Sequence, residues 1–457
     1  MIRLNFIVLF IITTFFACQN SDSNSTAVVT EAEEEKEHPN ITKLKAQSNE
    51  FKKELIQLGE RVYMGVGYDG SNAGMIVGDD GIVIIDGLRG IGAAEELFAD
   101  FRKITDKPVK ALIYTHGHGD HTGGASAFIK DPSKTRIIAR AHFKEELEGN
   151  SPVKKILIQR NIRQFGRDLP DEDIINRGVA AGRTPTDRAG KGYVPPNETF
   201  EESLSLTIAG IKIELQAANG ETNDELFVWL PDDKTLFTGD NYYKAFPNLY
   251  AIRGSQYRDV KSWGESIQRM SELPVEHLVP GHTRPLSGKE KIHRNLTNYA
   301  EAILSVYNQT IEGMNQGLSV DELCAKVELP AHLKEAENLQ EFYGSVPWGV
   351  RSIFFHFVGW FDGNPSQLYP LTPKVEAEQI VQLAGGTEKI KQQFNQAIQE
   401  KKYQWGMQLA DYLLALDKND AAAKQMKIQA LEKAATTQIN APARNYYLSY
   451  AREMEGK

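Results

Sequence analysis

The stretch THGHGDHTGG, residues 115–124, constrains this chain more than any other. It follows the apolar run ALIY, which predicts a strand, and glycines permit a tight path between its polar side chains. Imidazole and carboxylate groups are common zinc ligands, and one ion cannot easily take every donor from so short a segment. The stretch therefore predicts two adjacent metal ions at a strand end, held in part by His116, His118, Asp120 and His121.

The remaining pattern predicts an α/β fold followed by a helical region. From residue 61, short apolar runs broken by Gly and Asp predict strands, with helical periodicity at 92–105 and 260–273. Because the early strands are hairpin-like, we expect two mixed sheets with helices outside, a four-layer αββα sandwich. After about residue 290 the strand signals stop, and the chain predicts helical hairpins of the tetratricopeptide kind.

The metal motif resembles that of the metallo-β-lactamase superfamily, whose other elements follow in order over about 60–290. The resemblance implies an αββα catalytic domain at 46–290 and two Zn²⁺ ions per chain. It also implies that Asp86 supports the site from behind the ligands, that Asp240 bridges both ions and that His282 completes the second metal site.

The sequence of one turn indicates a particular branch of this superfamily. NGETND has Glu221 where most members place a histidine, and the alkyl sulfatase branch uses glutamate there. The stretches GDNYYKAFPNLYAIRGSQYRDVKSW, VPGHTRPLSG, SVPWGVRSIFFHFVGWFDGNPSQLYPL and ARNYYLSYARE are similar to that branch through its helical dimerisation domain, expected at 291–457. The implied metal ligands are His116, His118, Asp120, His121, Glu221, Asp240 and His282.

The branch implies a binuclear zinc hydrolase that cleaves alkyl or aryl sulfate esters to an alcohol and inorganic sulfate through a metal-bound hydroxide. Attack at carbon with inversion is also implied, although the sequence leaves open which bond breaks. The implied catalytic residues are Asp120, Asp240 and Arg253, and the substrate-binding candidates are Arg253, Asn248, Tyr250 and Tyr193.

Two departures leave parts of this reading open. Tyr243 and Pro247 stand where many alkyl sulfatases carry histidines, so the proton donor to the leaving group is unassigned. No sterol-carrier-like domain of the three-domain members is expected, which leaves the substrate length open.

A related fold could instead cleave a phosphoester, a lactone or a β-lactam. A lipid-anchored scaffold without catalysis is disfavoured by the intact set of metal ligands.

The N-terminus predicts export. Arg3, an apolar run and Ala17-Cys18 resemble a bacterial lipoprotein signal peptide at 1–18, with lipidation of Cys18 and location in the periplasm or at the outer membrane or cell surface. Residues 19–45, rich in Ser, Asn, Thr and Glu, predict a disordered tether.

The net charge of −9 argues against nucleic-acid binding, and the aromatic-rich stretch 345–361 predicts a homodimer interface.

Overall fold

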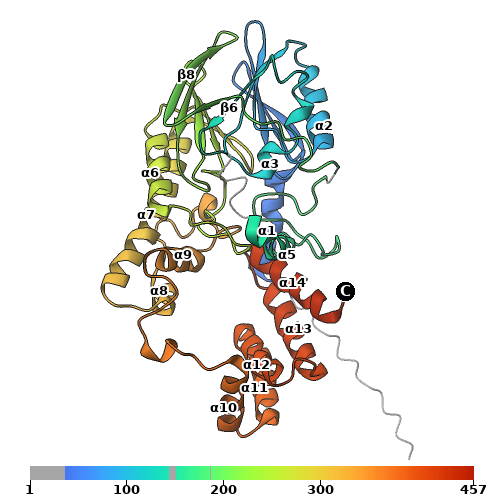
Figure 1. Ribbon diagram of the computed structural model, residues 1–457, viewed down its shortest axis with the longest axis vertical. Coiled ribbons are helices and arrows are strands. Elements are labelled where there is room, and N and C mark those ends of the chain that lie inside the picture. Colours follow the sequence, from blue (N-terminus) through green and yellow to red (C-terminus); the bar gives the residue numbers. More distant parts are fainter. Residues whose placement is uncertain (1–35, 144–150, 186) are drawn as a thin grey trace, which may run out of the picture. The chain divides into compact units, whose positions relative to one another are not determined.

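The first sheet contains seven strands in sequence order (Figure 1). The computed structural model describes residues 36–143, 151–185 and 187–457, and Glu37–Lys457 form one unit. The first four strands pair antiparallel, and the fourth to seventh pair parallel. They are β1 (Glu54–Leu58), β2 (Val62–Val66), β3 (Ala73–Val77), β4 (Ile82–Ile85), β5 (Val109–Ile113), β6 (Arg136–Arg140) and β7 (Glu198–Phe200).

The second sheet has six strands in the order β13-β12-β11-β10-β9-β8. All neighbours pair antiparallel except β11 and β12, which are parallel. The strands are β8 (Ser203–Ile208), β9 (Ile211–Ala217), β10 (Leu226–Leu230), β11 (Thr235–Gly239), β12 (His277–Pro280) and β13 (Leu286–Ser287). Both sheets are therefore mixed, as the hairpin-like sequence pattern predicts.

Three hydrophobic cores hold four layers together. The core between the sheets joins residues of both, such as Ile113 on β5 and Val228 on β10. Helix α2 (Ile91–Arg102) packs Phe101 on the outer face of the first sheet. Helices α6 (Val260–Ser271) and α7 (Lys289–Asn315) cover the outer face of the second, where Trp263 joins the same core as Trp229. This arrangement confirms the αββα prediction (Figure 1).

The C-terminal part is helical, as predicted. Helices α8 (Val320–Lys326) and α9 (Val346–Val358) share the core of α6 and α7. The boundary predicted at 290/291 therefore falls inside α7 and does not separate two cores. A further core unites α10 (Pro373–Ala384), α11 (Thr387–Gln399), α12 (Tyr403–Leu416), α13 (Ala421–Ala435) and α14 (Ala441–Glu455). Among the described helices, none is both long and apolar enough to cross a membrane.

The predicted tether is wrong at its C-terminal end. Pro39–Gln47 form helix α1, in which Ile41 and Leu44 are buried. Leu44 packs in a core with Tyr243 and Phe342, so this helix is stabilised by residues about 200 to 300 positions away. Composition alone does not reveal such partners. The predicted signal peptide at 1–18 and the tether up to residue 35 lie outside the described residues.

Candidate metal centre

The loops that follow strands in both sheets meet at one edge of the sandwich. His116 and His118 follow β5, and helix α3 (Gly119–Thr122) carries Asp120 and His121. Asp240 directly follows β11. The other two predicted ligands are Glu221, in the connection between β9 and β10, and His282, just after β12. Strand ends at one edge are where α/β folds commonly place their sites.

The structure brings all seven predicted ligands together. Within the described part of the chain, three groups of potential ligands have donor atoms that lie within 4.8 Å of one another. Their members are His116, His121 and Asp240; Asp120, His121 and His282; and His118, Glu221 and Asp240. Together the groups contain the seven predicted residues and no others.

Asp240 occupies the position expected of a bridging carboxylate. Its Oδ1 lies 3.2 Å from His121 Nε2. Its Oδ2 lies 3.2 Å from His282 Nε2 and 3.5 Å from His116 Nε2. Asp240 is 2% exposed and therefore offers each of its oxygens to histidines inside the protein. Glycine is required opposite it, because a Cβ at residue 281 would lie only 2.5 Å from Asp240 Oδ1.

Hydrogen bonds behind the histidines fix the orientation of their rings. His121 Nδ1 donates to Asp86 Oδ2 at 2.9 Å, and His282 Nδ1 contacts the Gly70 carbonyl oxygen at 2.8 Å. Asp86 is held by the backbone N–H and the hydroxyl of Thr115, both at 2.8 Å. Each ring therefore turns its Nε2 toward the centre of the site, which is how proteins present imidazole to a metal.

The donors fit divalent cations. His121 Nε2 and Asp240 Oδ1 are buried and lie 3.2 Å apart without forming a well-aligned hydrogen bond. Burial alone would lower the pKa of His121, but the Asp240 and Asp86 carboxylates raise it well above its usual value. The site therefore has an excess of negative charge that a cation would compensate. Imidazole with carboxylate is a ligand set that suits Zn²⁺.

Glu221 is not an exposed turn residue. It is 4% exposed, and its Oε1 forms an ion pair with Arg258 Nη2 at 2.8 Å. Its Oε2 accepts a hydrogen bond from the Tyr243 hydroxyl at 3.2 Å. The sequence reasoning did not single out Arg258, although this residue lies in the quoted stretch YRDVKSW. A buried arginine beside a ligand has no periodic signal that could identify it.

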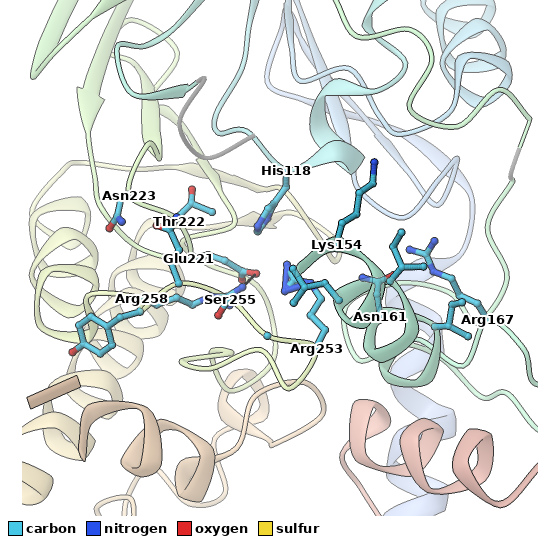
Figure 2. A pocket seen from close by; sticks show the side chains of 16 residues that line it. His118, Lys154, Asn161, Arg167, Glu221, Thr222, Asn223, Arg253, Ser255 and Arg258 are labelled. Carbon is cyan, nitrogen blue, oxygen red and sulfur yellow. Dashed lines mark ion pairs between the residues drawn. The ribbon is translucent and has the colours of Figure 1, made fainter. Parts of the chain in front are cut away.

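Two connecting cavities border the ligands. The larger, about 440 Å³, has an apolar wall formed by Leu157, Ile158 and Ile162 of helix α5 (Lys154–Gln164). The smaller, about 290 Å³, is lined by Asp120, Asp240 and His282 among others. His118, Asn161, Arg167, Glu221 and Arg253 line both. Figure 2 shows His118, Glu221 and Arg253 converging on the larger cavity, with Lys154 and Asn161 on its α5 side.

The predicted substrate residues are only partly assembled. Arg253 lines both cavities, and its Nη1 is buried without a hydrogen-bond partner. Asn248 and Tyr250 are not among the lining residues; the Asn248 carbonyl instead accepts a hydrogen bond from Arg258. Tyr193 packs beside Phe143 and Tyr114, with ring centroids 6.3 Å away in both cases. Its position does not support a substrate contact.

Comparisons with known proteins agree with this geometry. Residues 66–282 match the metallo-beta-lactamase superfamily, and residues 319–457 match the alkyl sulfatase dimerisation family. A linear primary-alkylsulfatase from Pseudomonas sp. is 34% identical over 391 residues, which are 84% of this chain and 74% of that protein. An (R)-specific secondary-alkylsulfatase from Pseudomonas sp. is 29% identical over 88% of this chain but only 62% of its own length.

A solved structure shows the same architecture. The stereoselective inverting sec-alkylsulfatase from Pseudomonas sp. superimposes with a TM-score of 0.83 at 26% identity. The match covers 90% of this chain and 67% of that one. The similarity thus extends through the sandwich and the helical region together.

Proposed function

Because the chain belongs to the alkyl sulfatase branch of the metallo-β-lactamase superfamily, we propose that it is a Zn²⁺-dependent hydrolase of alkyl sulfate esters. The products would be an alcohol and inorganic sulfate. The observation that carries the proposal is the position of Arg253. Its guanidinium borders the same cavities as the metal-site residues His118 and Glu221, so an ester sulfate can meet both.

Two Zn²⁺ ions fit the seven donors. His118, Glu221 and Asp240 would hold one ion, and Asp120, His121 and His282 the other. His116, which groups with His121 and Asp240, would complete the first set, as the family resemblance implies. When bound, such ions supply Lewis acidity and lower the pKa of water so that it attacks at neutral pH. Two divalent ions would bring four positive charges against three ligand carboxylates. The metal core would then be nearly neutral once the nucleophile is included, so sulfate binding would require further cations.

Arg253 supplies such a cation. A guanidinium presents a planar fork of N–H donors that matches two oxygens of a sulfate group. The backbone N–H of Arg253 donates to Gln164 Oε1 at 2.8 Å, which fixes this loop against α5. The buried Nη1 has no hydrogen-bond partner in the protein and is therefore free to donate to a sulfate oxygen. Such preorganised donors stabilise developing negative charge without reorganisation.

The other residues position ligands and exclude water. Arg258 and Tyr243 fix the Glu221 carboxylate, while Asp86 fixes the His121 ring. The apolar wall of α5 would pack against the alkyl part of the ester. We further propose attack at carbon with inversion of configuration. Hydrolysis in ¹⁸O-labelled water tests the attack at carbon, because the label would then appear in the alcohol and not in the sulfate.

A substrate panel tests the function itself. The zinc-loaded enzyme would be assayed with matched alkyl sulfates and alkyl phosphates, an aryl sulfate, a lactone and a β-lactam. We expect sulfate release to exceed every other reaction. An Asp240→Asn variant, which weakens the shared ligand, should lose this activity and serves as the control for contaminating enzymes. Preferential hydrolysis of the phosphate ester or of the ring substrates would reject the proposal.

The N-terminal signal motif and the helical region support two further proposals. The chain is an exported bacterial lipoprotein whose Cys18 carries the lipid, in the periplasm or at the cell surface. The match to the alkyl sulfatase dimerisation family indicates a homodimer. Consistent with a covered face, large apolar side chains at the end of α9 and just after it are 45–65% exposed: Phe355, Phe357, Val358 and Trp360.

A further inference from the structure

The smaller cavity contains more positive charge than one sulfate group requires. Four arginines line it: Arg89, Arg167, Arg177 and Arg253. They come from separate segments of the chain. Arg89 precedes α2, Arg167 and Arg177 follow α5, and Arg253 lies between β11 and α6. The fold alone therefore assembles this group, which is called the arginine cluster below.

The guanidinium groups of the arginine cluster are not directly paired with the described carboxylates. Within the described residues, none of the four guanidinium groups forms an ion pair with a carboxylate. Arg177 is 8% exposed, and its Nε is buried without a hydrogen-bond partner. Its Nη1 contacts only the Thr184 hydroxyl, at 3.1 Å. A buried charge without a partner costs free energy, so a structure that retains one indicates a ligand that supplies the missing charge.

The carboxylates of the same cavity are already committed. The described acidic residues that line it are Asp120, Glu221 and Asp240, which are all proposed metal ligands. Asp69 lies close by but accepts hydrogen bonds from the backbone N–H groups of Gly90 and Arg89. Burial and the neighbouring arginines lower the pKa of the buried Arg177 to about 10, although Asp69 acts in the opposite direction. Asp69 therefore compensates only part of the positive charge of the arginine cluster.

The two cavities divide the site into two lobes around Arg253. The larger lobe has the apolar wall of α5. The smaller lobe contains Arg89 and Arg177, which do not line the larger one. A simple alkyl sulfate has one anionic group and one apolar chain, so it would occupy Arg253 and the larger lobe. It would leave Arg89 and Arg177 without a partner.

We infer that the smaller lobe binds a second anionic group of the same substrate, a carboxylate or a second sulfate. The inference deepens the proposed function and rests on it, because it places the reacting sulfate ester at Arg253. The preferred substrate is then a dianionic sulfate ester and not a detergent-like monosulfate. Guanidinium groups bind carboxylate and sulfate alike through paired N–H donors. The feature required of the substrate is therefore a second oxyanion that a short linker separates from the sulfate ester.

Binding of sulfonates tests the inference without turnover. Sulfonates mimic sulfate esters but contain a C–S bond that the enzyme would not hydrolyse. The dissociation constants of alkane-α,ω-disulfonates of two to six carbons would be compared with those of matched monosulfonates on the zinc-loaded wild-type enzyme by calorimetry. We expect at least one disulfonate to bind on the order of tenfold more tightly. An ω-sulfonated carboxylate of the same length shows whether the second anion is a carboxylate.

Variants locate the second anion. Arg89→Gln and Arg167→Gln each remove one charge of the arginine cluster, and both residues are accessible enough that the fold should survive. Each should reduce the ratio of disulfonate to monosulfonate affinity toward one. Arg136→Gln is the matched control, since Arg136 pairs with Glu198 and lines neither cavity. Thermal unfolding of all three variants checks that they are folded.

The outcomes separate the two proposals. Equal affinity for disulfonates and monosulfonates in the wild-type enzyme overturns the inference, as does a preference that survives both substitutions in the arginine cluster. A preference that disappears in those variants but not in Arg136→Gln supports it. If that pattern appears while no sulfate ester is hydrolysed, the second anion site stands and the proposed sulfatase activity fails.

Discussion

Arg258 and Glu221 form an ion pair in the protein interior, with Arg258 Nη2 2.8 Å from Glu221 Oε1 and both side chains 3% exposed. Burial by itself would lower the pKa of Arg258, but Glu221 raises it above its usual value. Because Glu221 also belongs to a group of potential metal ligands with His118 and Asp240, this pair couples the metal site to the fold. Replacing either partner therefore affects both stability and metal binding.

Arg258→Ala should lower the free energy of unfolding by about 3–5 kcal/mol, because it leaves the buried Glu221 carboxylate without its partner. Denaturant unfolding of the metal-free protein measures this change directly. Arg136→Ala is the control: its pair with Glu198 is partly exposed and should be worth at most about 1 kcal/mol. Equal losses in the two variants would contradict the role assigned to the buried pair.

Glu221→Gln should reduce the zinc content from two ions per chain to one. The amide keeps the size of the side chain and a partner for Arg258, so it tests the ligand role more cleanly than alanine would. Native mass spectrometry counts the ions. His332→Ala is the control, because His332 is exposed and pairs only with Glu301 in the described structure. Two ions and normal turnover in Glu221→Gln would show that Glu221 is not a ligand.

Arg253→Ala should reduce kcat/KM for an alkyl sulfate by about 10²–10³, the usual loss for one preorganised electrostatic donor. Arg253→Lys should recover only part of the activity, since an ammonium group lacks the planar fork. Zinc content should stay unchanged in both variants because Arg253 is outside the ligand groups. Wild-type activity in the alanine variant would remove Arg253 from the sulfate site.

The exposed aromatic side chains after residue 354 predict the dimer interface. Phe357→Glu combined with Trp360→Glu places two charges where the side chains are 50% and 65% exposed. We expect a monomer in light scattering at micromolar concentration, because burying these charges costs more than the interface gains. Ile104→Glu, at a 38% exposed apolar position outside the residues 319–457 that match the dimerisation family, should leave the dimer intact. A wild-type monomer would refute the prediction.

Cys18→Ser should abolish lipidation and tight membrane association, since thioether attachment of lipid requires the thiol. Membrane fractionation and mass spectrometry of the mature N-terminus provide the readout. Cys324→Ser is a control for thiol loss elsewhere in the chain, where the cysteine packs against the core of α6 to α9. A mature wild-type protein without lipid, starting at a residue other than 18, would contradict the anchoring prediction.

Local sequence patterns were sufficient to predict the layered fold and the metal motif. Strand and helix periods are local properties, so runs such as IVIID and VKSWGESIQRMSEL identify their elements without knowledge of neighbours. The ligand pattern is also local: HGHGDH follows a strand, and Asp240 of FTGD and His282 of PGH lie just past the ends of strands. Strand ends must meet at a sheet edge, and this geometric constraint makes the assembly of the metal groups predictable.

Which charged side chains come into contact depends, in contrast, on the tertiary fold. The composition of residues 19–45 suggested a tether, but Pro39–Gln47 form helix α1. Contacts with the distant Tyr243 and Phe342 stabilise this helix, and the local composition does not reveal them. The pair of Arg258 with Glu221 joins the segment before α6 to the connection between β9 and β10, and the arginine cluster draws on separate loops. Electrostatic partners are set by distances of a few ångströms between segments far apart in the chain, and no local period encodes those distances.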